Sequence, residues 1–219
     1  KEGYYMNKNQ SAVDGSRFCQ VSDTDSIQLQ SEEAAVTRWR VSATDELVAH
    51  LLSLVGTPQG RPAIIAVDGR GGSGKTTLTT ALTAAVPGAQ AFHLDDLIWN
   101  EPLYDWDQLY VDTLTQLRRA GSLDLVPDKW REHGREGSIR IPAGSPLVLV
   151  EGTGAGLAAV RSLIDAHVWV QTGDDVAERR GRVSFSSNRS HCLGGPFPGG
   201  ARSGRARRRA RATHHLSLI

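Results

Sequence analysis

The sequence predicts an α/β protein in which helices cover both faces of a parallel sheet, as a three-layer α/β/α sandwich. Short apolar runs rich in β-branched residues, segments with apolar side chains at helical spacing, and glycine-rich turns between the two all point to this class. Strands that alternate with helices pair in parallel, because each crossover returns the chain to the same end of the sheet. We expect four or five such strands.

The sequence from Thr44 to Gly121 predicts three helices and two strands. A helix is expected from Thr44 to Gly56, because Leu47, Leu51 and Leu54 recur at helical spacing. A buried strand over residues 63–67, a glycine-rich loop and a helix over residues 78–86 follow. A second strand covers residues 90–94, and Asp105 and Gly121 mark the start and the end of another helix.

The second half is less regular. Residues 122–145 are rich in loop-forming residues, and residues 147–150 form the clearest buried strand, LVLV. We expect a helix over residues 157–163, a strand over residues 167–171, and a charged helix over residues 174–182. No strand pattern follows, so the sheet is expected to lack its last strand.

The two ends of the chain differ in composition from this domain, which we place at residues 42–183. Residues 1–41 are polar and lack an apolar period, which predicts a disordered leader. Residues 184–219 are rich in Arg, Gly, Ser and Pro, which predicts a disordered tail. Our hypothesis for this tail is a shift of reading frame in GC-rich coding DNA.

Cysteine usage, hydropathy and charge exclude several classes of protein. Cys19 and Cys192 lie far apart without metal-binding spacing, no apolar run is long enough to span a bilayer, and the first residues lack a signal peptide. We therefore expect a cytoplasmic protein without a membrane partner. From Ala177 onward ten arginines stand against Glu178, but this segment is poor in aromatic residues, so we expect no nucleic-acid partner.

The glycine-rich loop matches the phosphate-binding pattern GxxxxGK[ST] in full. Glycines let backbone N–H groups converge on phosphate oxygens, and the following helix directs its positive N-terminus at the same anion. Lys75 is then expected to bind the β- and γ-phosphates, and the Thr76 hydroxyl to bind Mg²⁺. The ATP-binding residues predicted in this way are Gly69, Arg70, Gly71, Gly72, Ser73, Gly74, Lys75, Thr76 and Thr77.

Three carboxylates are expected beside this loop, because open parallel sheets bind ligands at the carboxyl ends of their strands. Asp95 and Asp96 follow the second strand, and Glu151 follows LVLV. Phosphoryl transfer to an alcohol needs one carboxylate to accept the hydroxyl proton and another to hold Mg²⁺. We assign the first role to Asp95 and the second to Glu151. Asp68, before the loop, is either a strand-end residue or a functional one.

Four blocks carry a resemblance to a known family: IIAVDGRGGSGKTTL, HLDDLIW, LVLVEGTGAG and VWVQTGDDVAERRGR. In this order and spacing, over about residues 60–182, they resemble the uridine kinase-like branch of P-loop kinases, which is related to phosphoribulokinase and pantothenate kinase. The resemblance implies a P-loop NTPase fold and Asp95 as the catalytic base. Leu97 and Ile98 depart from the aromatic residues of the family at this point.

The resemblance also implies substrate and lid residues. Asp96, His133 and Arg135 match the acceptor-binding region, although Val126 and Pro127 stand where the family has Tyr. Arg179, Arg180 and Arg182 match lid arginines, which bind the transferring phosphate through their planar guanidinium groups. Four aromatic residues either stack on a base or pack in the core: Trp99, Tyr104, Trp106 and Trp130.

These features predict an enzyme that uses ATP and Mg²⁺ to phosphorylate a hydroxyl of a small molecule, and the resemblance implies a nucleoside or a similar alcohol as the acceptor. A sugar, a shikimate-like acid or a pantothenate-like vitamin is the alternative acceptor. A truncated protein that binds ATP without turnover is the alternative to an enzyme. The sequence does not predict an oligomeric state.

Overall fold

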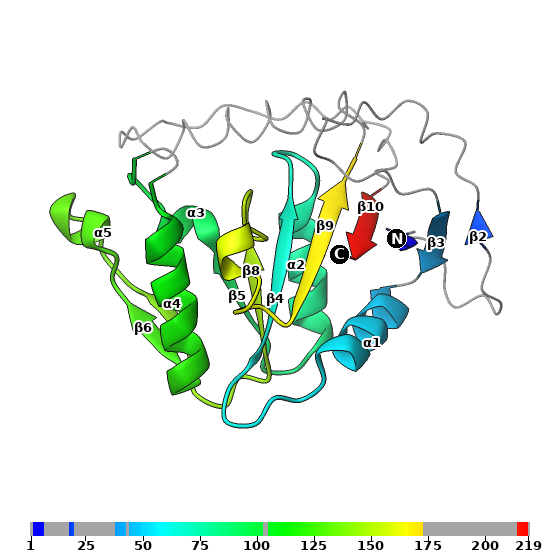
Figure 1. Ribbon diagram of the computed structural model, residues 1–219, viewed down its shortest axis with the longest axis horizontal. Helices are drawn as coiled ribbons and strands as arrows, with labels where there is room; N and C mark the ends of the chain where they lie inside the picture. Colours follow the sequence, from blue (N-terminus) through cyan, green and yellow to red (C-terminus); the bar gives the residue numbers. More distant parts are fainter. Residues whose placement is uncertain are drawn as a thin grey trace, which may run out of the picture.

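Four parallel strands form the centre of the protein, as the sequence predicts. The computed structural model describes residues 2–6, 18–19, 38–42, 44–102, 105–172 and 214–218. Strands β4 (Ala63–Gly69), β5 (Gln90–His93), β8 (Leu147–Glu151) and β9 (Ala166–Gln171) lie in the spatial order β9-β4-β8-β5 (Figure 1). Each neighbouring pair among them is parallel, so their carboxyl ends meet at one edge of the sheet.

Alternate residues of these strands face two helical layers, which is the sandwich that the sequence predicts. Ile65 and Val67 pack in a core with α1 (Thr44–Val55) and α2 (Lys75–Ala85). Ile64 and Ala66 pack on the opposite face with α3 (Leu94–Leu97) and α4 (Asp107–Ala120). Both faces are apolar because a parallel sheet is covered by its crossover helices on each side.

The sheet continues beyond β9, which corrects the prediction that it lacks a further strand. Strand β10 (His214–Leu218) pairs antiparallel with β9, and β1 (Glu2–Met6), β3 (Arg38–Ser42) and β2 (Phe18–Cys19) follow outward (Figure 1). A strand at a sheet edge presents backbone N–H and C=O groups that a further strand satisfies. These four short strands thus come from the segments that we expected to form the leader and the tail; the rest of both segments lies outside the described residues.

Two stretches between α4 and β9 also differ from expectation. The stretch over residues 122–145 contains the hairpin strands β6 (Leu123–Leu125) and β7 (Ile139–Ile141), with α5 (Asp128–Glu132) between them. Strands of three residues are too short to produce a recognisable period. The helix expected over residues 157–163 is a single 3₁₀ turn, η2 (Ala158–Val160), which is preceded by non-helical backbone at Leu157.

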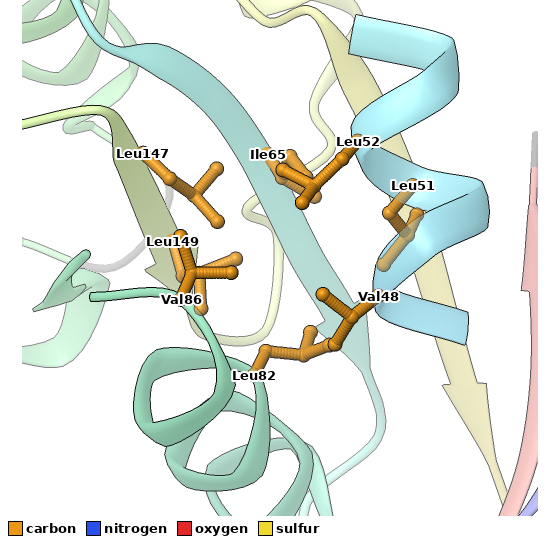
Figure 2. A pocket seen from close by; sticks show the side chains of 8 residues that line it. All are labelled: Val48, Leu51, Leu52, Ile65, Leu82, Val86, Leu147 and Leu149. Atoms are coloured by element: carbon orange, nitrogen blue, oxygen red, sulfur yellow. The ribbon is translucent and has the colours of Figure 1, made fainter. Parts of the chain in front are cut away.

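A small apolar opening lies between α1, α2 and the sheet (Figure 2). Its lining offers no hydrogen-bonding side chain, so it does not fit a nucleotide. The residues that line this opening are Val48, Leu51, Leu52, Ile65, Leu82, Val86, Leu147 and Leu149.

Among the described residues, the helices are too short or too polar to span a bilayer.

Asp165 fixes the amino-terminal ends of β4 and β9, at the edge of the sheet opposite to the phosphate-binding loop. Its carboxylate accepts two hydrogen bonds from Arg61, at 2.7 and 2.8 Å, and one from the Ile64 amide at 2.8 Å. Arg118 lies 3.4 Å from the same carboxylate. Burial opposes ionisation of Asp165, but the hydrogen bonds from Arg61 and Ile64 outweigh it and hold the pKa of Asp165 below its usual value.

We expect Asp165→Asn to lower the free energy of unfolding by about 2 kcal/mol at pH 7, because hydrogen bonds to a charged group are lost. Since the folded pKa lies below the unfolded value of about 3.9, this contribution is present above that value and disappears as the pH falls through the folded pKa. Urea unfolding between pH 3 and 7 should therefore show that the difference in the free energy of unfolding between parent and variant becomes smaller as the pH falls. The exposed Asp124, paired with Arg140, is the control: Asp124→Asn should leave the urea midpoint unchanged. A constant difference between parent and Asp165→Asn at every pH would contradict this role.

Candidate active site

The glycine-rich loop joins the carboxyl end of β4 to the start of α2, where the sequence places it. Gly69 has φ +142, and a Cβ atom there would lie 2.1 Å from the Val170 carbonyl oxygen of β9. Gly74 is the N-cap of α2 with φ 103 and makes no side-chain cap hydrogen bond. The amides in the first turn of a helix have no acceptors within the helix, so they are suited to bind an anion.

Lys75 is buried and folds back over this loop. Its ammonium group donates to the carbonyl oxygens of Gly69 and Arg70, at 2.8 and 2.9 Å, and lies 3.3 Å from the Thr153 hydroxyl oxygen. Burial lowers the pKa of Lys75, and the negative charges of Glu151, Asp68 and Asp95 act in the opposite direction. The lysine thus lies among three carboxylates at the carboxyl edge of the sheet: Asp68 in β4, Glu151 at the end of β8, and Asp95 in α3, which follows β5.

Glu151 links the loop to β5. Its Oε2 atom accepts a hydrogen bond from the Thr76 hydroxyl at 3.2 Å and lies 2.7 Å from His93 Nδ1. The register explains this contact, since His93 and Val67 stand level with Glu151 on the two neighbouring strands. The hydrogen bond to Glu151 is the largest effect on His93 and raises the pKa of its imidazole. Thr76 and Glu151, the two expected Mg²⁺ ligands, are therefore adjacent.

Asp68 connects the loop to the chain that follows β8. Its buried carboxylate accepts hydrogen bonds from the backbone amides of Gly69, Gly154 and Gly156, at 2.6, 2.9 and 2.9 Å. These bonds fix the turn that carries Thr153, which in turn donates to the Gly69 carbonyl at 3.1 Å. Of the two readings that the sequence leaves open for Asp68, these contacts favour the structural one.

Asp95 and Asp96 are the second and third residues of α3, which starts at Leu94 directly after the end of β5 at His93. Asp95 is exposed, and no hydrogen bond to its carboxylate comes from the described residues. Asp96 is paired with Arg135, whose Nη2 atom lies 2.5 Å from Asp96 Oδ1. The two neighbouring carboxylates thus differ, because one is engaged by an arginine and the other remains available.

His133 also lies on this side, 2.5 Å from the Asn100 side chain and edge-on to the indole of Trp99. The structure therefore brings together Asp96, His133 and Arg135, the three residues to which the sequence assigns substrate binding; that role stays a prediction. Trp130 is buried in the core, whereas Trp99 is 38% exposed.

Comparisons with solved structures identify the fold. A "putative fructose transport system kinase" from Silicibacter sp. TM1040 matches with a TM-score of 0.51 and 16% identity, over 70% of this chain and 84% of that one. A "possible uridine kinase" from Bacillus stearothermophilus matches with a TM-score of 0.45 and 16% identity, over 68% and 92% of the two chains. No family model and no curated protein matches the sequence. The chain has a P-loop kinase-like fold. At this level of identity, the match extends to the fold alone.

The residues present fit ATP and Mg²⁺, the two ligands that the GxxxxGK[ST] pattern predicts. The first turn of α2, which has no side-chain cap, and the buried ammonium group of Lys75 both fit a polyphosphate. The described residues contain no group of three or more His, Cys, Asp or Glu that could hold a metal by itself. Mg²⁺ bound with a nucleotide needs only one or two protein oxygens besides phosphate and water, which Thr76 and Glu151 can supply.

The sequence predicts the P-loop and the carboxylates beside it, but it does not predict the contacts of His93 and Thr153 with the site. It assigned no role to His93 or Thr153, although each contacts a candidate site residue. The signal available for His93 was its place at the end of a strand next to LVLV. The predicted lid arginines (Arg179, Arg180 and Arg182) and Tyr104 lie outside the described residues.

Proposed function

We propose that the protein is a small-molecule kinase that transfers the γ-phosphoryl group of ATP to a hydroxyl. The observation that carries this proposal is the cluster at the carboxyl edge of the sheet, where a complete P-loop lies beside Glu151 and the available carboxylate of Asp95. The same edge binds ligands in other open parallel sheets.

Each residue has a proposed task. Lys75 leaves its carbonyl partners and binds β- and γ-phosphate oxygens, and the loop amides bind the remaining ones. Thr76 and Glu151 hold Mg²⁺, which neutralises phosphate charge when it is bound. Asp95 accepts the proton of the acceptor hydroxyl, while the oxygen of that hydroxyl forms a bond to the γ-phosphorus. The bond from the γ-phosphorus to the bridging oxygen breaks, and ADP leaves. Arg179 and Arg180 are proposed to stabilise the charge of the transferring group.

The charges on the acceptor side favour an acceptor without net negative charge. Asp95 and Asp96 both lie there, and Arg135, the cation beside them, is already paired with Asp96. An anionic acceptor would face the Asp95 carboxylate without a compensating charge from these groups. We therefore propose a nucleoside or a sugar in preference to a shikimate-like acid or a pantothenate-like vitamin.

An acceptor screen tests this function. The full chain is incubated with MgATP and a panel of nucleosides, neutral sugars, hydroxy acids and vitamins, and ADP formation is compared with a reaction without acceptor. We expect stimulation by a neutral compound and a phosphorylated product that is heavier by one phosphoryl group. ATP binding without any transfer over the panel would instead favour the non-catalytic alternative.

We expect Glu151→Gln to raise the Mg²⁺ concentration needed for half-maximal transfer by about ten-fold, because an amide oxygen lacks the charge of the carboxylate. Titration of Mg²⁺ at saturating ATP measures this change. Glu46→Gln, on the exposed part of α1, is the matched control and should keep the parental titration. Identical Mg²⁺ titrations for Glu151→Gln and the parent would remove Glu151 from the metal site.

A further inference from the structure

Helix α3 has four residues and depends on neighbouring segments for its position. Leu94 and Leu97 attach the helix to the protein, since both side chains are fully buried in the core. The Asp95 carboxylate accepts no hydrogen bond from the described residues, so its direction depends on what holds the rest of the helix. Helices this short are not stable without tertiary contacts.

The segment that includes α5 supplies such contacts. The indole Nε1 of Trp130 donates to the Asp96 carbonyl oxygen at 2.8 Å, and Arg135 pairs with the carboxylate of the same residue. Asp96 is thus held through both its backbone and its side chain. The Arg135 amide donates to the Trp130 carbonyl at 2.8 Å, so the two residues form one unit.

Arg135 is itself fixed in place by aromatic rings. Its guanidinium carbon lies 3.7 Å from the centre of the Trp130 ring and 5.3 Å from that of Trp99. A planar guanidinium group can stack on an indole and pair with a carboxylate at the same time, whereas an ammonium group lacks the planar shape for both.

We infer that Arg135 is a positioning residue, which acts through Asp96 to hold α3 so that Asp95 points at the acceptor hydroxyl. This inference rests on the proposed kinase function. It differs from the role that the sequence assigns to Arg135, which is direct contact with the substrate. Transfer is sensitive to this position, because a displacement of about 1 Å at a reacting group can reduce the rate by about 100-fold.

The test combines a kinetic and a structural measurement on the full chain. Arg135→Gln and Arg135→Lys are compared with the parent, with the fastest acceptor from the screen above. We expect kcat to fall by about 10-fold or more in both variants, with KM for ATP and for the acceptor within about two-fold. Hydrogen exchange, measured without any ligand, should rise in peptides that cover α3 and stay unchanged in those that cover α2.

Arg131→Gln is the matched control. Arg131 lies in the same segment and is also paired with an aspartate, Asp128, but that pair is exposed, and no hydrogen bond or ion pair among the described residues joins it to α3. We expect it to keep parental kinetics and exchange. Asp96→Asn should reproduce the effect of Arg135→Gln, and the double variant should be no slower than either single variant, because the two residues act as one unit.

Two results would overturn the inference. A raised KM for the acceptor with unchanged kcat would return Arg135 to direct substrate contact, and unchanged exchange in α3 would show that Arg135 does not hold the helix. Failure of the proposed function is distinguishable from both. In that case no acceptor supports transfer by the parent, while the exchange measurement still reports whether Arg135 holds α3.

Discussion

Lys75→Ala is expected to reduce phosphoryl transfer by about 1000-fold, because the variant loses the positive charge placed at the β- and γ-phosphates. Fold stability should change little, since the partners of the ammonium group in the absence of nucleotide are two backbone carbonyls of the loop and the hydroxyl of Thr153, which follows β8. Steady-state ADP formation with the best acceptor measures the loss, and circular dichroism should give the parental spectrum.

Lys129 provides the control for this variant. It is the other lysine in the part of the chain that the structure describes, and it pairs with Glu132 on the exposed side of α5. Lys129→Ala should keep parental activity and nucleotide affinity. Equal nucleotide affinity and equal transfer in Lys75→Ala and the parent would show that the loop is not the nucleotide site.

Asp95→Asn is expected to lower kcat by about 1000-fold while nucleotide binding persists, because the amide keeps the size of the side chain but cannot accept the proton. A fluorescent ATP analogue should bind both proteins with similar affinity.

Asp128→Asn is the control, because Asp128 is an exposed carboxylate at the start of α5 and pairs with Arg131. Its kcat should equal that of the parent. If Asp95→Asn were fully active, Asp95 would not be the base, and the base would have to be sought at Asp96 or Asp128 instead.

Local chemistry made several elements predictable from sequence. Helix α1 ends at Val55 because Gly56 adopts φ +61, and α4 ends at Gly121, whose amide donates to the Leu117 carbonyl. Both boundaries follow from glycine in the left-handed region. The start of α4 was less accurate, because Asp105 was expected to begin the helix and Trp106 is its N-cap.

The parts that sequence missed depend on long-range contacts. Residues 157–163 have helical spacing, but Asp68 binds the amides of Gly154 and Gly156 and holds the preceding turn in a non-helical path. The pairing of β10 with β9 joins residues far apart in the chain. For the site, the P-loop was predictable because its chemistry lies in consecutive residues, whereas the contact of His93 with Glu151 follows from strand register.

The hydrogen bonds of Lys75 have a consequence for the nucleotide-free protein. An ammonium group buried at this edge would be costly without acceptors, yet the Gly69 and Arg70 carbonyls already provide them. The loop thus carries its own substitute for the phosphate oxygens. An incoming nucleotide therefore exchanges one set of oxygen partners for another, and the observed affinity reflects the difference between the two sets.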